Sequence, residues 1–119
     1  MPLPRKLPKK EKRARRWRSQ AHCNFVRGHA CSFCGSDVAI EVAHVRVGSG
    51  AGMGQKPSDD RTCSLCKECH TRQHTIGERT FWAEYFANTG EDVESLIDAF
   101  CKASPKAREI AEHRRDNGR

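Results

Sequence analysis

Long hydrophobic runs are missing from this sequence, and aromatic residues are few: five Phe, two Trp and one Tyr among 119 residues. No stretch approaches the roughly 20 apolar residues of a transmembrane helix, so we expect no membrane contact. The first basic residues are not followed by an apolar run, so we expect no secretory signal. Internal repeats are also absent. The hydrophobic content of 36% predicts one small domain with a modest core.

Positive charge is concentrated at one end of the chain. Residues 1–18 hold nine of the 22 Lys/Arg and one of the 15 Asp/Glu, a net charge of +8, whereas residues 19–119 carry −1. This distribution indicates a near-neutral body and a basic arm that binds phosphates. Residues 11–22 contain neither proline nor glycine, which predicts a helix, and Trp17 is expected to anchor it to the body.

Cysteine, by contrast, is abundant, with seven residues. Without a secretory signal we expect a reducing cytoplasm, where close pairs bind metals more often than they form disulfides. Cys31 with Cys34, and Cys66 with Cys69, have the spacing of zinc knuckles, and Gly35 allows the turn that points amide groups at sulfur. Four thiolates close a tetrahedral coordination sphere, so we predict a structural Zn²⁺.

Three further cysteines lie outside these two pairs. Cys63 alternates with Leu65 and is expected to pack as a small apolar residue, although its spacing from Cys66 also suits a metal. Cys23 is an alternative or neighbouring ligand. Cys101 falls on the apolar face of a predicted helix and is assigned to the core.

The first half of the body alternates turns and strands. Residues 23–37 are rich in turn formers. Residues 38–47 are rich in β-branched side chains, which predicts a strand with His44 near its end. Residues 48–61 contain four glycines and a proline, which predicts a long loop. This loop does not match the phosphate-binding pattern GxxxxGK[ST]. A short returning strand is expected over residues 62–65.

The second half is helical in pattern. Residues 67–76 predict a helix closed by Gly77. A second helical pattern breaks at residues 88–90, resumes up to Pro105, and is followed by a polar helix within residues 106–119. The sequence therefore predicts an α+β fold.

Two histidines fall on the predicted helix 67–76. His70 and His74 are four residues apart and share one helix face, where two imidazoles can hold one divalent cation. An exposed pair without a ligand is the alternative.

Taken together, these motifs resemble the HNH, or ββα-metal, nucleases, and in particular small phage- and prophage-type members. The resemblance covers about half of the chain. The residues that carry it are Ala43, His44, Asp59 and the run Cys66-Lys-Glu-Cys69-His70-Thr-Arg-Gln-His74.

The resemblance implies a role for each histidine. His44 matches the general base, which takes a proton from the water that attacks phosphorus. His70 and His74 match the ligands of a catalytic divalent cation that stabilises the leaving oxygen. Mg²⁺ or Mn²⁺ is favoured, and Zn²⁺, Ni²⁺ or Co²⁺ would also suit two imidazoles.

The sequence departs from the family pattern in two places. Ala43 stands where many members carry an Asp or His metal ligand, so Asp59, Glu41, water or the phosphate must complete the shell. The family's middle Asn is absent, and Asp59 or Asp60 occupies that region. Asp59 is better placed, either to orient the base imidazole or to bind the cation.

Basic residues near these motifs are candidates for contacts with backbone phosphates. Those flanking the predicted site are Arg46, Lys56, Arg61 and Arg72. Those in the arm are Lys9, Lys10, Arg13 and Arg16.

We therefore predict an endonuclease that hydrolyses DNA phosphodiesters, single- or double-stranded, with little sequence preference. Its parts are a basic arm and helix (1–22), a zinc-stapled ββα core (23–77) and a C-terminal helical extension packed on the core (78–119). Two alternatives stay open: a non-catalytic zinc module that binds nucleic acid or protein, and a two-zinc protein in which the histidines are structural.

Overall fold

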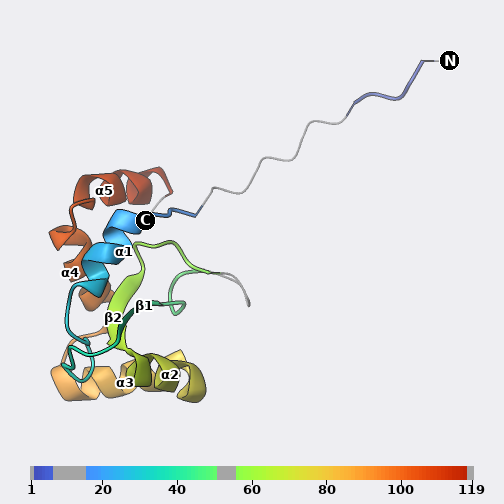
Figure 1. The fold of residues 1–119 in the computed structure, drawn as a ribbon. Coiled ribbons are helices and arrows are strands. Elements are labelled where there is room, and N and C mark those ends of the chain that lie inside the picture. The colour runs from blue at the N-terminus through green and yellow to red at the C-terminus, as the bar shows by residue number, and fades with distance from the viewer. Residues whose placement is uncertain (1, 7–15, 51–55, 118–119) are drawn as a thin grey trace.

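Two antiparallel strands lie between groups of helices at the two ends of the structure (Figure 1). This computed structural model describes residues 2–6, 16–50 and 56–117. The elements in chain order are α1 (Gln20–Arg27), β1 (Ile40–His44), β2 (Thr62–Cys66), α2 (Lys67–Ile76), α3 (Glu78–Thr89), α4 (Val93–Ala103) and α5 (Ala107–Asp116). The predicted α+β class is confirmed. Within the described residues, no helix has the length and apolar character needed to cross a membrane.

Helix α1 begins later than predicted. The Ser19 hydroxyl accepts a hydrogen bond from the backbone N–H of His22 and so caps the helix at Gln20. Residues 16–19 are not helical, because the backbone of Trp17 hydrogen-bonds to the loop before β2 instead. The helix predicted for residues 11–22 is therefore wrong over 16–19, and residues 11–15 lie outside the described part of the chain.

The sheet consists of β1 paired with β2, from Ile40 opposite Cys66 to His44 opposite Thr62. Strand β1 is shorter than the predicted 38–47. Ala39 has a φ of 55°, in the left-handed region, so the chain bends just before the strand. The inward face of β1 is set by Ala43, which is fully buried.

The predictions for the helical half are largely confirmed. Helix α2 spans residues 67–76 as expected, and the N–H of Gly77 donates to the Gln73 carbonyl at its end. Helix α3 ends at Gly90, whose φ of 78° and ψ of 1° place it in the left-handed conformation that glycine adopts without strain. Helix α4 stops before Pro105, and α5 follows.

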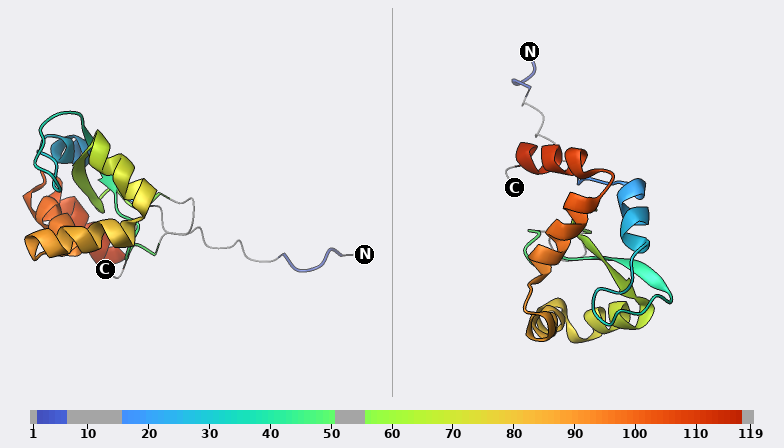
Figure 2. Two further views of the ribbon diagram at one scale, coloured as in Figure 1. Left: turned by 90° about the horizontal axis from the view of Figure 1, so that it is seen from below. Right: turned by 90° about the vertical axis from the view of Figure 1, so that its left-hand side faces the viewer.

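The helices enclose the sheet from two ends. Figures 1 and 2 show α2 and α3 together at one end of the molecule and α5 at the other. The fully buried side chains include Leu65 of β2 and Phe81 of α3. Phe33, from the turn that carries Cys31 and Cys34, stacks on Phe81 with ring centroids 4.6 Å apart. The cysteine turn is thus packed against α3 as well as against the sheet.

One fully buried histidine joins three elements. Nδ1 of His22 in α1 lies 2.8 Å from the Ser104 hydroxyl after α4, and Nε2 lies 3.5 Å from the Thr62 hydroxyl of β2. Burial lowers the pKa of His22 below its ordinary 6.5, although Asp60 and Asp59 oppose this shift. The folded protein therefore holds this imidazole neutral.

We expect His22 to make folding stability depend on pH. Below about pH 6.5 the unfolded chain binds a proton at this position that the folded chain rejects, so the free energy of unfolding falls as the pH decreases. Urea denaturation at pH 7.5 and pH 5.5 measures this loss. The variant His22→Gln should be less stable at pH 7.5 but lose less stability on acidification. An equal loss in both proteins would contradict the assignment.

Candidate functional site

The four cysteines with knuckle spacing meet at one point. The sulfurs of Cys31, Cys34, Cys66 and Cys69 all lie within 4.8 Å of one another, and those of Cys34 and Cys66 are 3.7 Å apart. A tetrahedral ion with metal–sulfur bonds of about 2.3 Å requires sulfur separations of about 3.8 Å. The cluster can therefore hold a metal ion.

The backbone presents the first two cysteines as a tight turn. The N–H of Cys34 points at the Cys31 sulfur over 3.4 Å, and Gly35 has a φ of 80°, as the predicted knuckle requires. The turn is fixed to β2 by the N–H of Ser32, which donates to the Ser64 carbonyl over 2.8 Å. Burial disfavours a thiolate, but backbone N–H groups lower the pKa of Cys31 to about 7.

The other two cysteines of the cluster lie at the junction of strand and helix. Cys66 is the last residue of β2 and the N-cap of α2, and Cys69 lies in the first turn of that helix. The remaining cysteines are not part of the cluster. Cys63 and Cys101 are buried in the core as predicted, and Cys23 is half-buried in a neighbouring cleft.

That cleft, of about 920 Å³, lies over β1 and the start of α1. His44 of β1 and both His70 and His74 of α2 line it. The other residues of its wall are Arg18, Ser19, Gln20, Cys23, Arg27, Ile40, Glu41, Val42, Arg46, Lys56, Pro57 and Asp59.

His44 is hydrogen-bonded to a carboxylate in the wall of the cleft. Nε2 of His44 lies 2.9 Å from Oδ1 of Asp59. Burial opposes ionisation of Asp59, but hydrogen bonds from His44 and from the Ser19 N–H lower its pKa below the ordinary value. An ionised carboxylate only accepts, so the His44 ring must donate from Nε2. In the neutral ring, Nδ1 then carries the free lone pair.

Asp59 has further partners in the N-terminal segment. Its Oδ1 accepts from Arg18 over 3.2 Å, and its Oδ2 accepts from the backbone N–H of Ser19 over 2.8 Å. Both oxygens are thus committed to donors on one side of the cleft. The hydrogen bond to His44 is the contact that the first of its two predicted roles, orientation of the imidazole, requires. Its predicted role as a ligand of the cation shared with His70 and His74 stays a prediction.

The histidine pair has another carboxylate beside it. Nδ1 of His70 lies 2.9 Å from Oε1 of Glu41, and the rings of His70 and His74 are 4.9 Å apart. Two imidazoles and a carboxylate are donors of the kind that divalent cations accept. Among the described residues, however, only the four cysteines gather three or more ligand atoms within 4.8 Å. A cation on this wall would therefore need water or phosphate oxygens to complete its shell.

Ala43 precedes the proposed base, yet it does not face the cleft. Its side chain is fully buried and lies opposite Cys63 in the sheet. Glu41, two residues earlier on β1, is the carboxylate that reaches His70.

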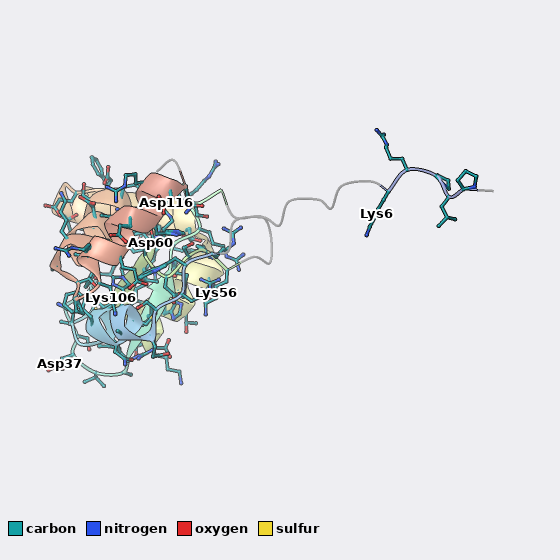
Figure 3. All side chains as sticks on the ribbon, turned by 90° about the horizontal axis from the view of Figure 1, so that it is seen from above. Lys6, Asp37, Lys56, Asp60, Lys106 and Asp116 are labelled. Carbon is teal, nitrogen blue, oxygen red and sulfur yellow. The ribbon has the colours of Figure 1, made fainter. Side chains whose placement is uncertain are left out.

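The predicted phosphate contacts divide into two groups. Arg46 and Lys56 line the cleft, and Figure 3 shows Lys56 on the side of the body away from Asp37. Arg61 does not line it: its side chain is only 8% exposed and is bound to Glu94 and to the carbonyl of Val47. The prediction for Arg61 is wrong because its guanidinium is used inside the fold.

Arg72 is also outside the cleft. It pairs with Glu84 over 2.6 Å and lies over the ring of Phe33, so it connects α2, α3 and the cysteine turn. Arg16 is half-buried and does not line the cleft. The predicted contacts at Lys9, Lys10 and Arg13 lie outside the described residues.

Two arginines of the cleft were not found from the sequence. Arg18 belongs to a run of basic residues in which nothing marks it as different, and Arg27 ends a helix whose position was predicted wrongly. Only the proximity of α1 to β1 brings them to the cleft. Assignment of Ser19 as the N-cap would have placed Arg18 just before the start of α1 and Arg27 near its end.

Together, the cluster and the cleft define a small α+β protein in which four cysteines that could hold a metal ion lie beside a basic, histidine-lined cavity. Residues 4–103 match the family described as "Protein of unknown function (DUF968)", and the chain belongs to this family. No curated protein and no solved structure matches the chain.

We expect substitution of a cluster cysteine, but not of a core cysteine, to reduce the amount of metal bound per chain. Cys34→Ser should remove the bound ion and lower the melting temperature, because three thiolates no longer close the coordination sphere. Elemental analysis of purified protein measures the metal per chain. Cys63→Ala, a buried cysteine outside the cluster, is the control and should retain the ion. Equal metal content in Cys34→Ser and the wild type would contradict the assignment.

The burial of Arg61 generates a separate prediction. Arg61→Gln should lower the free energy of unfolding by about 3 kcal/mol, because Glu94 and two backbone carbonyls lose a charged donor. Chemical denaturation checks this value. Lys56→Gln removes the same charge from an exposed position and should change stability by less than about 0.5 kcal/mol. Similar losses in both variants would show that Arg61 is not a structural residue.

Proposed function

We propose that this protein is a metal-dependent endonuclease of the ββα-metal type that hydrolyses DNA phosphodiester bonds. The observation that carries the proposal is the cleft, in which a carboxylate-oriented His44 faces a space shared with His70 and His74. A binding module has no need to orient one imidazole and direct two others to the same cavity.

The order of elements supports the proposal. Strands β1 and β2 followed directly by α2 form a ββα unit, with His44 at the end of the first strand and His70 and His74 on the helix. These positions match those that the pattern of the HNH nucleases assigns to the base and to the ligands of the catalytic cation. We propose that the cysteine cluster holds Zn²⁺, since four thiolates suit a closed, structural zinc site.

His44 is proposed as the general base. With Nε2–H donated to Asp59, Nδ1 can accept a proton from a water molecule as its oxygen attacks phosphorus. Burial lowers the pKa of His44, with Asp59 opposing the shift, so the ring is neutral and able to accept at neutral pH. The bond between phosphorus and the 3′ oxygen then breaks, as the HNH pattern implies, which leaves a 5′-phosphate and a 3′ oxygen that takes a proton from water to become a hydroxyl.

The cleft also suits a phosphate-bearing substrate. Four basic side chains from the described residues line it, namely Arg18, Arg27, Arg46 and Lys56. Glu41, His70 and His74 would hold a divalent cation together with oxygens of the substrate and water. The chemistry that such a cation supplies is neutralisation of charge on the phosphate and on the leaving oxygen.

Plasmid nicking tests the proposal. The wild type should convert supercoiled DNA to the nicked form with Mg²⁺ or Mn²⁺ but not with EDTA. His44→Ala should reduce the rate by at least about 100-fold, because no other group in the cleft replaces the base. His29→Ala, which alters an exposed histidine outside the cleft, is the control and should cleave like the wild type. Circular dichroism verifies that each protein is folded.

Two results would count against this function. Unchanged nicking by His44→Ala would remove the mechanism. DNA binding without cleavage by the wild type, with either cation, would favour the non-catalytic zinc module instead.

A further inference from the structure

The segment before α1 is joined to the loop that carries Asp59. The backbone N–H of Trp17 donates to the Ser58 hydroxyl over 3.1 Å, and the N–H of Asp59 donates to the Trp17 carbonyl over 2.9 Å. The Trp17 ring is fixed from the other side, since its Nε1 donates to Glu109 of α5 over 3.0 Å. This part of the N-terminal region is built into the body.

Arg18 makes three contacts with the same loop. Its guanidinium donates to the carbonyl of Lys56 over 3.0 Å, to the carbonyl of Pro57, and to Oδ1 of Asp59 over 3.2 Å. A planar guanidinium can hold two carbonyls and a carboxylate at once because its donors have a fixed geometry. Lysine, with a single ammonium group, cannot reproduce this arrangement.

These contacts control the orientation of the carboxylate. The Asp59 side chain is 9% exposed and receives donors from Arg18, from the Ser19 backbone and from His44. Without Arg18, the Ser19 N–H and the Cys23 thiol would be the contacts left to oppose rotation of the carboxylate away from His44. The N–H of Ser19 binds Oδ2, whereas Arg18 and His44 both bind Oδ1, so loss of Arg18 would release the oxygen that holds the His44 ring.

We infer that Arg18 is a positioning residue for the proposed reaction: it locks the Asp59 carboxylate and thereby fixes the ring orientation and the Nε2–H tautomer of His44. Arg18 acts through Asp59 and is not itself catalytic. The residues that were expected to form a separate basic arm thus include part of the site. The kinetic consequence rests on the proposed function, but the effect on the His44 ring does not.

Other charged groups near His44 must be considered beside Arg18. Asp59 and Lys56 belong to the adjoining loop, and Cys23 of α1 lies against Asp59. Lys56 is exposed and has the same charge as Arg18. A purely electrostatic role would be preserved in Arg18→Lys, whereas a geometric lock would not.

The nitrogen chemical shifts of the His44 ring test the inference without any need for cleavage. In ¹⁵N-labelled full-length protein at pH 8, the wild type should show one tautomer, protonated at Nε2. Arg18→Gln and Arg18→Lys should both show a mixture of tautomers. Arg108→Gln, which removes a charge from an exposed position on α5, should match the wild type. An unchanged tautomer in both Arg18 variants would overturn the inference.

Cleavage kinetics provide the second readout. Arg18→Gln should lower kcat by about tenfold or more with a smaller change in KM, because a misoriented base affects the reaction rather than binding. Arg108→Gln should leave both constants unchanged. A raised KM with normal kcat would show that Arg18 only contacts phosphate and would overturn the inference. If the wild type does not cleave, the proposed function fails, while the nitrogen shifts still decide the role of Arg18.

Discussion

The meeting of four thiol groups is the constraint on which the rest of the structure depends. It ties the turn of residues 31–34 to the junction between β2 and α2, two segments about 30 residues apart in the chain. A chain of this size buries a modest core, and a metal ion held by these four cysteines would add a fixed point where hydrophobic contacts alone are few. The stacking of Phe33 on Phe81 extends this fixed point into α3.

The position of α2 follows from that constraint, and the cleft follows from α2. Because Cys66 and Cys69 lie at the start of the helix, the face that carries His70 and His74 is held beside β1. The sheet register places His44 at the end of β1 opposite Thr62, whereas the other end of β1 lies opposite Cys66. Rigid elements rather than loops therefore carry the three histidines, which is the arrangement that holds a site in a defined geometry.

The basic residues of the chain divide between the cleft and the interior of the fold. The cleft collects basic side chains from the N-terminal segment, α1, the segment after β1 and the loop before β2, and Asp59 in its wall accepts a hydrogen bond from Arg18. Other arginines serve the fold, as Arg61 does by binding Glu94 and backbone carbonyls. Two basic residues of one loop, Lys56 and Arg61, thus have different uses, and the difference arises only from which one is buried.

The sequence by itself determined the local features of this protein. The cysteine spacing, the i, i+4 histidine pair and Gly77 specified α2 and the side chains that it presents, because these features depend on neighbours within a few residues. Tertiary structure alone decided the start of α1, the burial of Arg61 and the use of Asp59 to orient His44. Each of these depends on contacts between segments far apart in the chain, where competition for hydrogen bonds and for burial overrides local preference.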